Sequence, residues 1–101
     1  MYTVFSTFDV NEEKAEEVIG IYQNRSHLVD SAEGFVDFFL LQNDKRPGEL
    51  TVQLIFNNKK DYLQWVRGED FKRIHELEKK YPDQELAAVI PKVSQYKVVA
   101  R

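Results

Sequence analysis

The hydrophobic residues of this chain repeat with two different periods, and the order of those periods restricts the fold more than any single motif. Residues 2–10 alternate between two faces, as in a β-strand, and both faces carry aromatic side chains. The two faces consist of Tyr2, Val4, Ser6, Phe8 and Val10, and of Thr3, Phe5, Thr7 and Asp9. Since neither face is wholly polar, we expect both faces of this strand to be covered.

A helical period follows the first strand. Asn11 is a residue type that favours the N-cap, and two glutamates after it suit the positive end of a helix. Apolar residues then recur three or four apart at Ala15, Val18, Ile19 and Tyr22, which predicts a helix of about three to four turns. Residues 24–33 lose this period and predict a loop or a frayed helix end that leads to Gly34.

The middle of the chain predicts a hairpin, and the second half predicts a helix and a last strand. Residues 35–42 and 50–56 are short apolar runs separated by the turn cluster NDKRPGE, which indicates an antiparallel hairpin with a loop of about seven residues. Asn58 is a cap for a second helix that reaches about Lys80, interrupted near Gly68 and ended by Tyr81 and Pro82. Residues 93–100 alternate again and predict the final strand.

This order, βαββαβ, is that of the ferredoxin-like fold of the α+β class. We therefore expect residues 1–101 to form a single domain in which an antiparallel sheet carries both helices on one face. The other face then needs a cover. Because the first strand is aromatic on both sides, we expect a second subunit to provide it, and the chain to be a homodimer.

Composition excludes several classes of function. The chain has 101 residues, no cysteine and a formal net charge of −3, and its basic residues are scattered. A disulfide framework, a thiolate nucleophile and cysteine-ligated metals are therefore excluded, and nucleic acid is not an expected partner. No run of eighteen apolar residues and no secretory leader pattern is present, so we expect no membrane partner and a cytoplasmic location.

Two histidines and one tryptophan are the remaining candidates for chemistry. His75 follows Phe71 by four residues, so it lies at the edge of the apolar stripe of its helix, where an imidazole can ligate iron. Trp65 lies ten residues earlier, within about 80° of His75 on an uninterrupted helix. The alternatives are a helix histidine satisfied by a neighbouring carboxylate or carbonyl and an ordinary core tryptophan. His27 lies in a polar loop and is expected to be a solvated surface residue.

Polar positions within the aromatic first strand are further candidates. Ser6 and Thr7 stand among aromatic and β-branched neighbours, and a hydroxyl that points into a cavity can orient a bound molecule. The alternative is a threonine that faces solvent and is chosen for its strand propensity.

Two segments carry a family resemblance. The segment AEGF at residues 32–35 and the segment YLQWVRGEDFKRIH at residues 62–75 resemble the Isd-type haem-degrading members of the antibiotic biosynthesis monooxygenase superfamily. The specific part is a tryptophan followed by phenylalanine six residues on and histidine ten residues on. The resemblance implies a homodimer whose two sheets form an α/β barrel, with one active site per subunit between sheet and helices.

The resemblance also implies roles for single residues. His75 would be the proximal ligand of the haem iron, Trp65 would pack against the porphyrin and help to distort it, and Phe71 would line the haem site. An ungapped count back from Glu33 places Thr7 where relatives have an asparagine that bonds to iron-bound oxygen. Tyr22 and Ser26 fall near the arginines that meet haem propionates in relatives, and Arg25 is close but out of register.

The function implied is oxidative cleavage of haem with dioxygen and electrons from an external reductase, haem being both cofactor and substrate. Two alternatives stay open. One is a cofactor-free monooxygenase of the same superfamily, acting on a quinol-like or polycyclic substrate with His75 as a general base. The other is a protein without enzymatic activity that binds or stores haem or another apolar ligand.

Overall fold

A computed structural model describes residues 1–78 and 89–101 of the chain. Within these residues the element order is βαββαβ, with a 3₁₀-helix before the second strand and the second helix divided into two, which confirms the predicted α+β ferredoxin-like fold. The strands are β1 (Tyr2–Asp9), β2 (Phe35–Gln42), β3 (Glu49–Phe56) and β4 (Lys92–Lys97). The helices are α1 (Glu12–Gln23), the 3₁₀-helix η1 (Leu28–Ser31), α2 (Lys59–Val66) and α3 (Glu69–Glu78).

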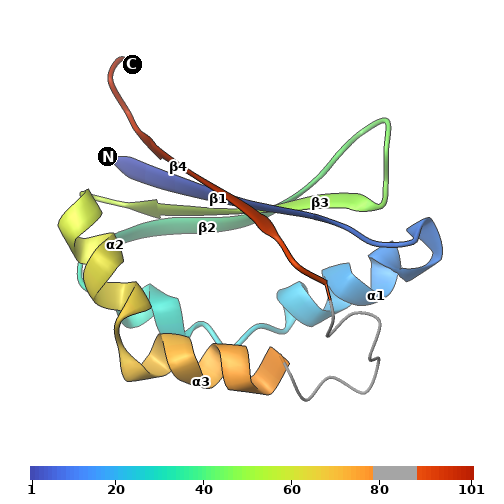
Figure 1. Ribbon diagram of the computed structural model, residues 1–101, viewed down its shortest axis with the longest axis horizontal. Coiled ribbons are helices and arrows are strands. Elements are labelled where there is room, and N and C mark those ends of the chain that lie inside the picture. Colours follow the sequence, from blue (N-terminus) through green and yellow to red (C-terminus); the bar gives the residue numbers. More distant parts are fainter. Residues whose placement is uncertain (79–88) are drawn as a thin grey trace.

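The four strands form one antiparallel sheet in the order β2-β3-β1-β4. In the described part of the chain all helices lie against one face of this sheet, and the opposite face carries none (Figure 1). We call these the helix face and the open face. The two-layer arrangement predicted from the sequence is therefore confirmed.

The core lies between the sheet and the helices and is made chiefly by β1 and β3, the two central strands. Their register pairs Tyr2 with Phe56 and Val4 with Leu54. One core cluster gathers residues from the sheet, η1 and α2, namely Tyr2, Val4, Val29, Phe56, Tyr62 and Trp65. A smaller cluster beside α1 is formed by Val18 and Leu50. The first half of β1 therefore packs in the main cluster and its second half packs against the smaller one.

Several local features differ from the prediction. The segment expected as a loop or a frayed helix end contains η1, and its 3₁₀ turn buries Val29 against the core. Asn11 occupies the N-cap of α1, but its side chain makes no capping hydrogen bond, whereas Asn58 caps α2 by accepting from the Asp61 amide at 2.9 Å. The last strand ends at Lys97 instead of Ala100. The expected helix end at residues 79–82 lies outside the described residues.

Two interruptions decide how η1 and α3 are placed. Gly34 adopts φ of 80°, and a Cβ there would collide with the Asp61 carboxylate, so only glycine fits between η1 and β2. Gly68 separates α2 from α3, as the sequence predicts, and its amide donates to the Trp65 carbonyl at 3.0 Å. The chain therefore turns directly after Trp65.

Candidate active site

The turn at Gly68 assembles a row of three rings. Trp65 is buried, with only 8% of its surface exposed. Its indole lies edge-on to the Phe71 ring, with 6.0 Å between the ring centroids, and the Phe71 ring lies 4.3 Å from the His75 imidazole. On one continuous helix, Trp65 and His75 would lie on one side of the helix. Because the chain changes direction between α2 and α3, the Phe71 ring lies between Trp65 and His75 and contacts both. Three of the four predicted site residues, Trp65, Phe71 and His75, are therefore brought together.

The outer end of this row is accessible. His75 is exposed on α3, while Trp65 at the other end belongs to the main core cluster. The row therefore runs from the interior to the surface on the helix side of the molecule. His27, by contrast, lies in the loop before η1, where its Nδ1 is 3.2 Å from Asp30 and its side chain is 60% exposed. His27 is thus a surface residue, as expected.

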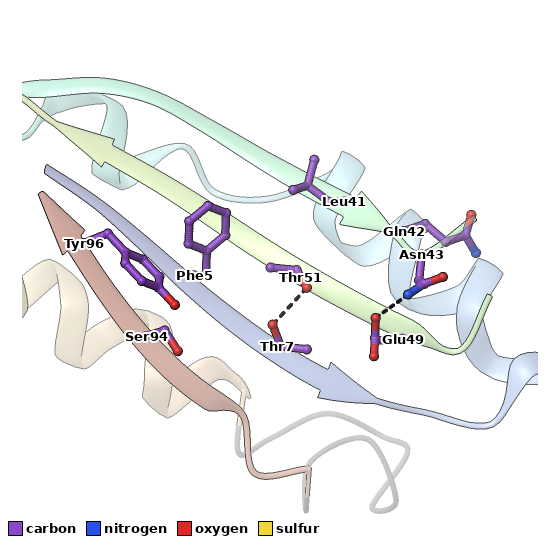
Figure 2. Close-up of a pocket in the computed structure, with 9 residues that line it drawn as sticks. All are labelled: Phe5, Thr7, Leu41, Gln42, Asn43, Glu49, Thr51, Ser94 and Tyr96. Atoms are coloured by element: carbon purple, nitrogen blue, oxygen red, sulfur yellow. Dashed lines mark hydrogen bonds between the residues drawn. The ribbon is translucent and has the colours of Figure 1, made fainter. Parts of the chain in front are cut away.

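Thr7 is not brought to this row. It lies on the open face, where its hydroxyl shares a hydrogen bond of 2.9 Å with the hydroxyl of Thr51 on β3 (Figure 2). Trp65 and its neighbours pack against the helix face, so the sheet itself separates Thr7 from them. The position found by an ungapped count along the sequence therefore faces the wrong side of β1 for contact with Trp65 or His75.

Ser6, the residue before Thr7, lies on the opposite face of β1 from Thr7. It lies between Val4, in the main core cluster, and Phe8, which packs against the smaller cluster by α1. Because side chains alternate along a strand, Ser6 shares the helix face with both. Its register partners are Val52 on β3 and Val93 on β4, so apolar residues flank its hydroxyl. The alternation in the sequence itself carries this signal, since it places Ser6 with Tyr2 and Val4.

A stack of rings lies beside Ser6 on the helix face. The Tyr22 ring stacks on Phe8 and on Phe38, with centroid distances of 6.4 and 6.2 Å and an angle of 27° between planes in both pairs. The Arg25 guanidinium lies 4.1 Å from the centroid of the Phe38 ring. These contacts join the end of α1 to the sheet and place a cation over an aromatic surface.

Arg25 is held in place by Asp30. Two guanidinium nitrogens donate to the Asp30 carboxylate at 2.9 and 3.3 Å. Burial by itself would raise the pKa of Asp30, but the hydrogen bonds from Arg25 and His27 outweigh it and hold the pKa below its usual value. Asp30 is therefore ionised at neutral pH, and the Arg25 side chain is fixed with 20% of its surface exposed.

Two hollows differ in their relation to the ring row. One, of about 290 Å³, lies beside Trp65 between η1 and the start of α3, and four carboxylates line it. These carboxylates belong to Glu33, Asp61, Glu69 and Asp70. The other, of about 610 Å³, lies on the open face and includes Thr7, Thr51 and Tyr96 (Figure 2). The larger hollow is thus separated from His75 by the sheet.

The donor set suits a metal that brings most of its own ligands. Among residues 1–78 and 89–101, no group of three or more histidine, cysteine or carboxylate side chains is placed to hold a metal ion. A haem iron needs less from the protein, because the porphyrin supplies four nitrogens and one imidazole completes the proximal side. An accessible His75 beside two aromatic rings fits this requirement.

Comparison with known proteins gives the family. The sequence matches the family model described as antibiotic biosynthesis monooxygenase over residues 1–77. The chain belongs to the antibiotic biosynthesis monooxygenase family. The match includes the first strand, the hairpin and both halves of the Trp65–His75 row. No curated protein sequence matches this family member significantly.

Solved structures agree with this assignment at the level of the fold. MhuD from Mycobacterium tuberculosis, a haem degrader with two haems in its active site, is 17% identical, with a TM-score of 0.79 over 100% of this chain and 98% of its own. An Arg-to-Ser variant of MhuD with two manganese protoporphyrins per active site is 18% identical, with a TM-score of 0.80, covering 100% and 97%. A conserved protein from Methanosarcina mazei is 21% identical, with a TM-score of 0.70, covering 95% and 90%. At these identities the likeness establishes the fold.

Within the described residues, no helix is both long enough and apolar enough to cross a membrane.

Proposed function

We propose that this antibiotic biosynthesis monooxygenase family member binds haem and cleaves it oxidatively, with dioxygen and electrons from an external reductase. The observation that carries the proposal is the row of Trp65, Phe71 and His75, with centroid distances of 6.0 and 4.3 Å. The family assignment supports a monooxygenase, and the haem-bound state of MhuD supports haem as the molecule that is bound.

Each residue of the row has a separate role in this proposal. The exposed His75 imidazole ligates the iron, and the Phe71 ring limits how that imidazole can rotate. The buried Trp65 indole presents a rigid aromatic surface to the porphyrin and excludes water from it. Bound haem would supply the iron that activates dioxygen and would itself be the molecule cleaved.

Ser6 replaces Thr7 as the proposed polar group of the sheet. The helix face around it is apolar, with Val52 and Val93 as its register partners. A single hydroxyl among apolar side chains can donate a hydrogen bond that orients a bound molecule. Ser6 therefore orients a polar group of the bound molecule, while Thr7 serves the packing of the open face.

Arg25 is the proposed anchor for a carboxylate of the ligand. Its guanidinium already lies over the Phe38 ring and already forms two hydrogen bonds with a carboxylate, that of Asp30. A haem propionate presents the same chemical group, so it can share or replace Asp30 with little change in the position of Arg25.

The proposed assembly is a homodimer joined by the open faces of two sheets. Apolar side chains are exposed on this face, among them Phe39 at 44%, Leu41 at 41% and Tyr96 at 54%. A second copy presents the same residues, which is the condition for a two-fold interface. Each subunit then keeps its own helix face for the ligand.

Absorption spectroscopy of the purified protein tests the proposal. Haem is titrated into the wild type, His75→Ala and His27→Asn, the last being a matched control that suits the left-handed backbone at position 27. We expect a saturable Soret shift in the wild type and the control, and its loss in His75→Ala because the iron loses its ligand. An unchanged shift in His75→Ala would remove His75 as the ligand.

A second step in the same cuvette separates binding from degradation. A reductant is added under air with catalase, which removes free peroxide. We expect the Soret band to decay, because the bound haem is cleaved. A stable band would instead indicate haem storage, and no saturable binding would move the assignment to a cofactor-free monooxygenase, tested by oxidation of a quinol with the metal-free protein.

A further inference from the structure

The main core cluster contains a line of oxidisable side chains that packing alone does not require. Tyr2, Tyr62 and Trp65 are all buried, with exposed fractions of 7%, 8% and 8%. Trp65 is the only tryptophan in the chain. Phenylalanine would fill similar space without burying polar atoms, and Phe56 does so beside Tyr62, at a centroid distance of 5.9 Å.

In space, Trp65, Tyr62 and Tyr2 follow one another from the proposed haem site toward the edge of the sheet. Trp65 contacts Phe71, which contacts His75. Tyr62 precedes Trp65 by three residues on α2, so the two lie on one face of that helix. The Tyr62 and Tyr2 rings are 5.6 Å apart between centroids. Tyr2, Tyr62 and Trp65 belong to one buried cluster, so no solvent layer separates the three rings.

The outer end of the line has a route for a proton. The Tyr2 hydroxyl donates to Oε1 of Gln95 at 2.6 Å, and Gln95 is an exposed residue of the edge strand β4. Burial, together with the neighbouring Tyr2, raises the pKa of Tyr62, so the Tyr62 phenol keeps its proton at neutral pH. Oxidation of a neutral phenol releases its proton. The hydrogen bond to the exposed Gln95 directs the Tyr2 hydroxyl to the sheet edge, where water can take up that proton.

We propose that Trp65, Tyr62 and Tyr2 form an electron relay that carries oxidising equivalents away from the Trp65–His75 site to the sheet edge at Gln95. The oxidant would be a one-electron oxidant of the kind that bound haem forms with peroxide. The role of the relay therefore rests on the proposed function. The oxidant gains one electron through Trp65 and Tyr62, and Tyr2 loses that electron. Water at the exposed sheet edge beside Gln95 takes up the Tyr2 proton, and a small hydrogen-atom donor such as ascorbate restores Tyr2.

Because the chain has no cysteine, the relay can be tested without haem. A ruthenium–bipyridine photo-oxidant is attached to the thiol of His75→Cys, at the exposed end of the ring row. After a laser flash with an electron-accepting quencher, transient absorption and electron paramagnetic resonance follow the radicals. We expect a tyrosyl radical whose yield falls several-fold with Tyr2→Phe and whose formation slows several-fold with Tyr62→Phe.

Tyr96→Phe is the matched control, because Tyr96 lies on the open face and loses the same hydroxyl (Figure 2). Radical yields and rates in Tyr2→Phe and Tyr62→Phe equal to those of this control would overturn the relay. In the haem-loaded protein treated with peroxide, mass spectrometry should find several-fold more oxidised Trp65 in Tyr62→Phe than in wild type. This second readout requires haem binding and the first does not, so failure of the relay and failure of the proposed function are distinguishable.

Discussion

At the scale of single residues, the two neighbouring hydroxyls of β1 have opposite environments. Ser6 lies on the helix face between apolar neighbours, and Thr7 shares a hydrogen bond with Thr51 on the open face. One step along a strand exchanges the faces, so an ungapped count that is wrong by one residue selects a side chain on the far side of the sheet. The assignment of a strand residue to a site therefore needs the face as well as the position.

This difference predicts opposite outcomes for two conservative variants. Ser6→Ala should slow haem degradation and change the spectrum of the haem-loaded protein, because the bound molecule loses its hydrogen-bond donor. Thr7→Val should leave both unchanged and lower the free energy of unfolding by about 1 kcal/mol through the lost bond to Thr51. Spectra, turnover and urea denaturation measure these effects. A Thr7→Val protein with the altered spectrum and an unaffected Ser6→Ala would reverse the assignment.

At the scale of elements, the connections between helices and strands set the geometry of the ring row. The turn at Gly34 carries η1 into β2, and its carbonyl accepts from the Asn57 amide at 2.8 Å, directly before α2. Gly68 then separates α2 from α3, so that Phe71 meets Trp65. The backbone conformation at Gly34 and Gly68 determines where η1 and α3 lie, and the hydrophobic pattern of the sequence does not predict that conformation.

Two glycine substitutions should therefore have opposite effects on stability. Gly34→Ala should lower the free energy of unfolding by more than about 1 kcal/mol, because φ is positive and the new Cβ meets Asp61. Gly20→Ala, in the interior of α1 with no atom within 4 Å of the new Cβ, should raise it by about 0.5–1 kcal/mol. Urea denaturation of both variants is the measurement. Equal effects of one sign would contradict this account of Gly34.

At the scale of the whole molecule, the two faces of the sheet carry different features. The helix face carries the ring row, and the open face leaves apolar side chains exposed, with no helix of the described residues against it (Figure 1). In the proposed homodimer, burial of this face against a second copy would add stability to a chain of this size.

The proposed homodimer predicts that a charge on the open face changes the oligomeric state. Phe39→Asp should shift the protein from dimer to monomer in sedimentation experiments, because a carboxylate would be buried in the interface without a partner. Gln64→Asp, at an exposed position on α2, is the control and should remain a dimer. A wild-type monomer, or a dimer that tolerates Phe39→Asp, would exclude this face as the interface.

The sequence by itself determined the order of the elements and the fold class, since periods of two and 3.6 residues are local properties of the chain. It also predicted the interruption at Gly68 and the Asn58 cap, which depend on neighbouring residues only. The tertiary structure decided which side chains meet. The contact between Trp65 and Phe71 depends on the angle between two helices, and the separation of Thr7 from His75 depends on which face of the sheet the helices cover. Both the helix angle and the covered face depend on residues that are far apart in the sequence, so the spacing of residues along the chain does not predict them.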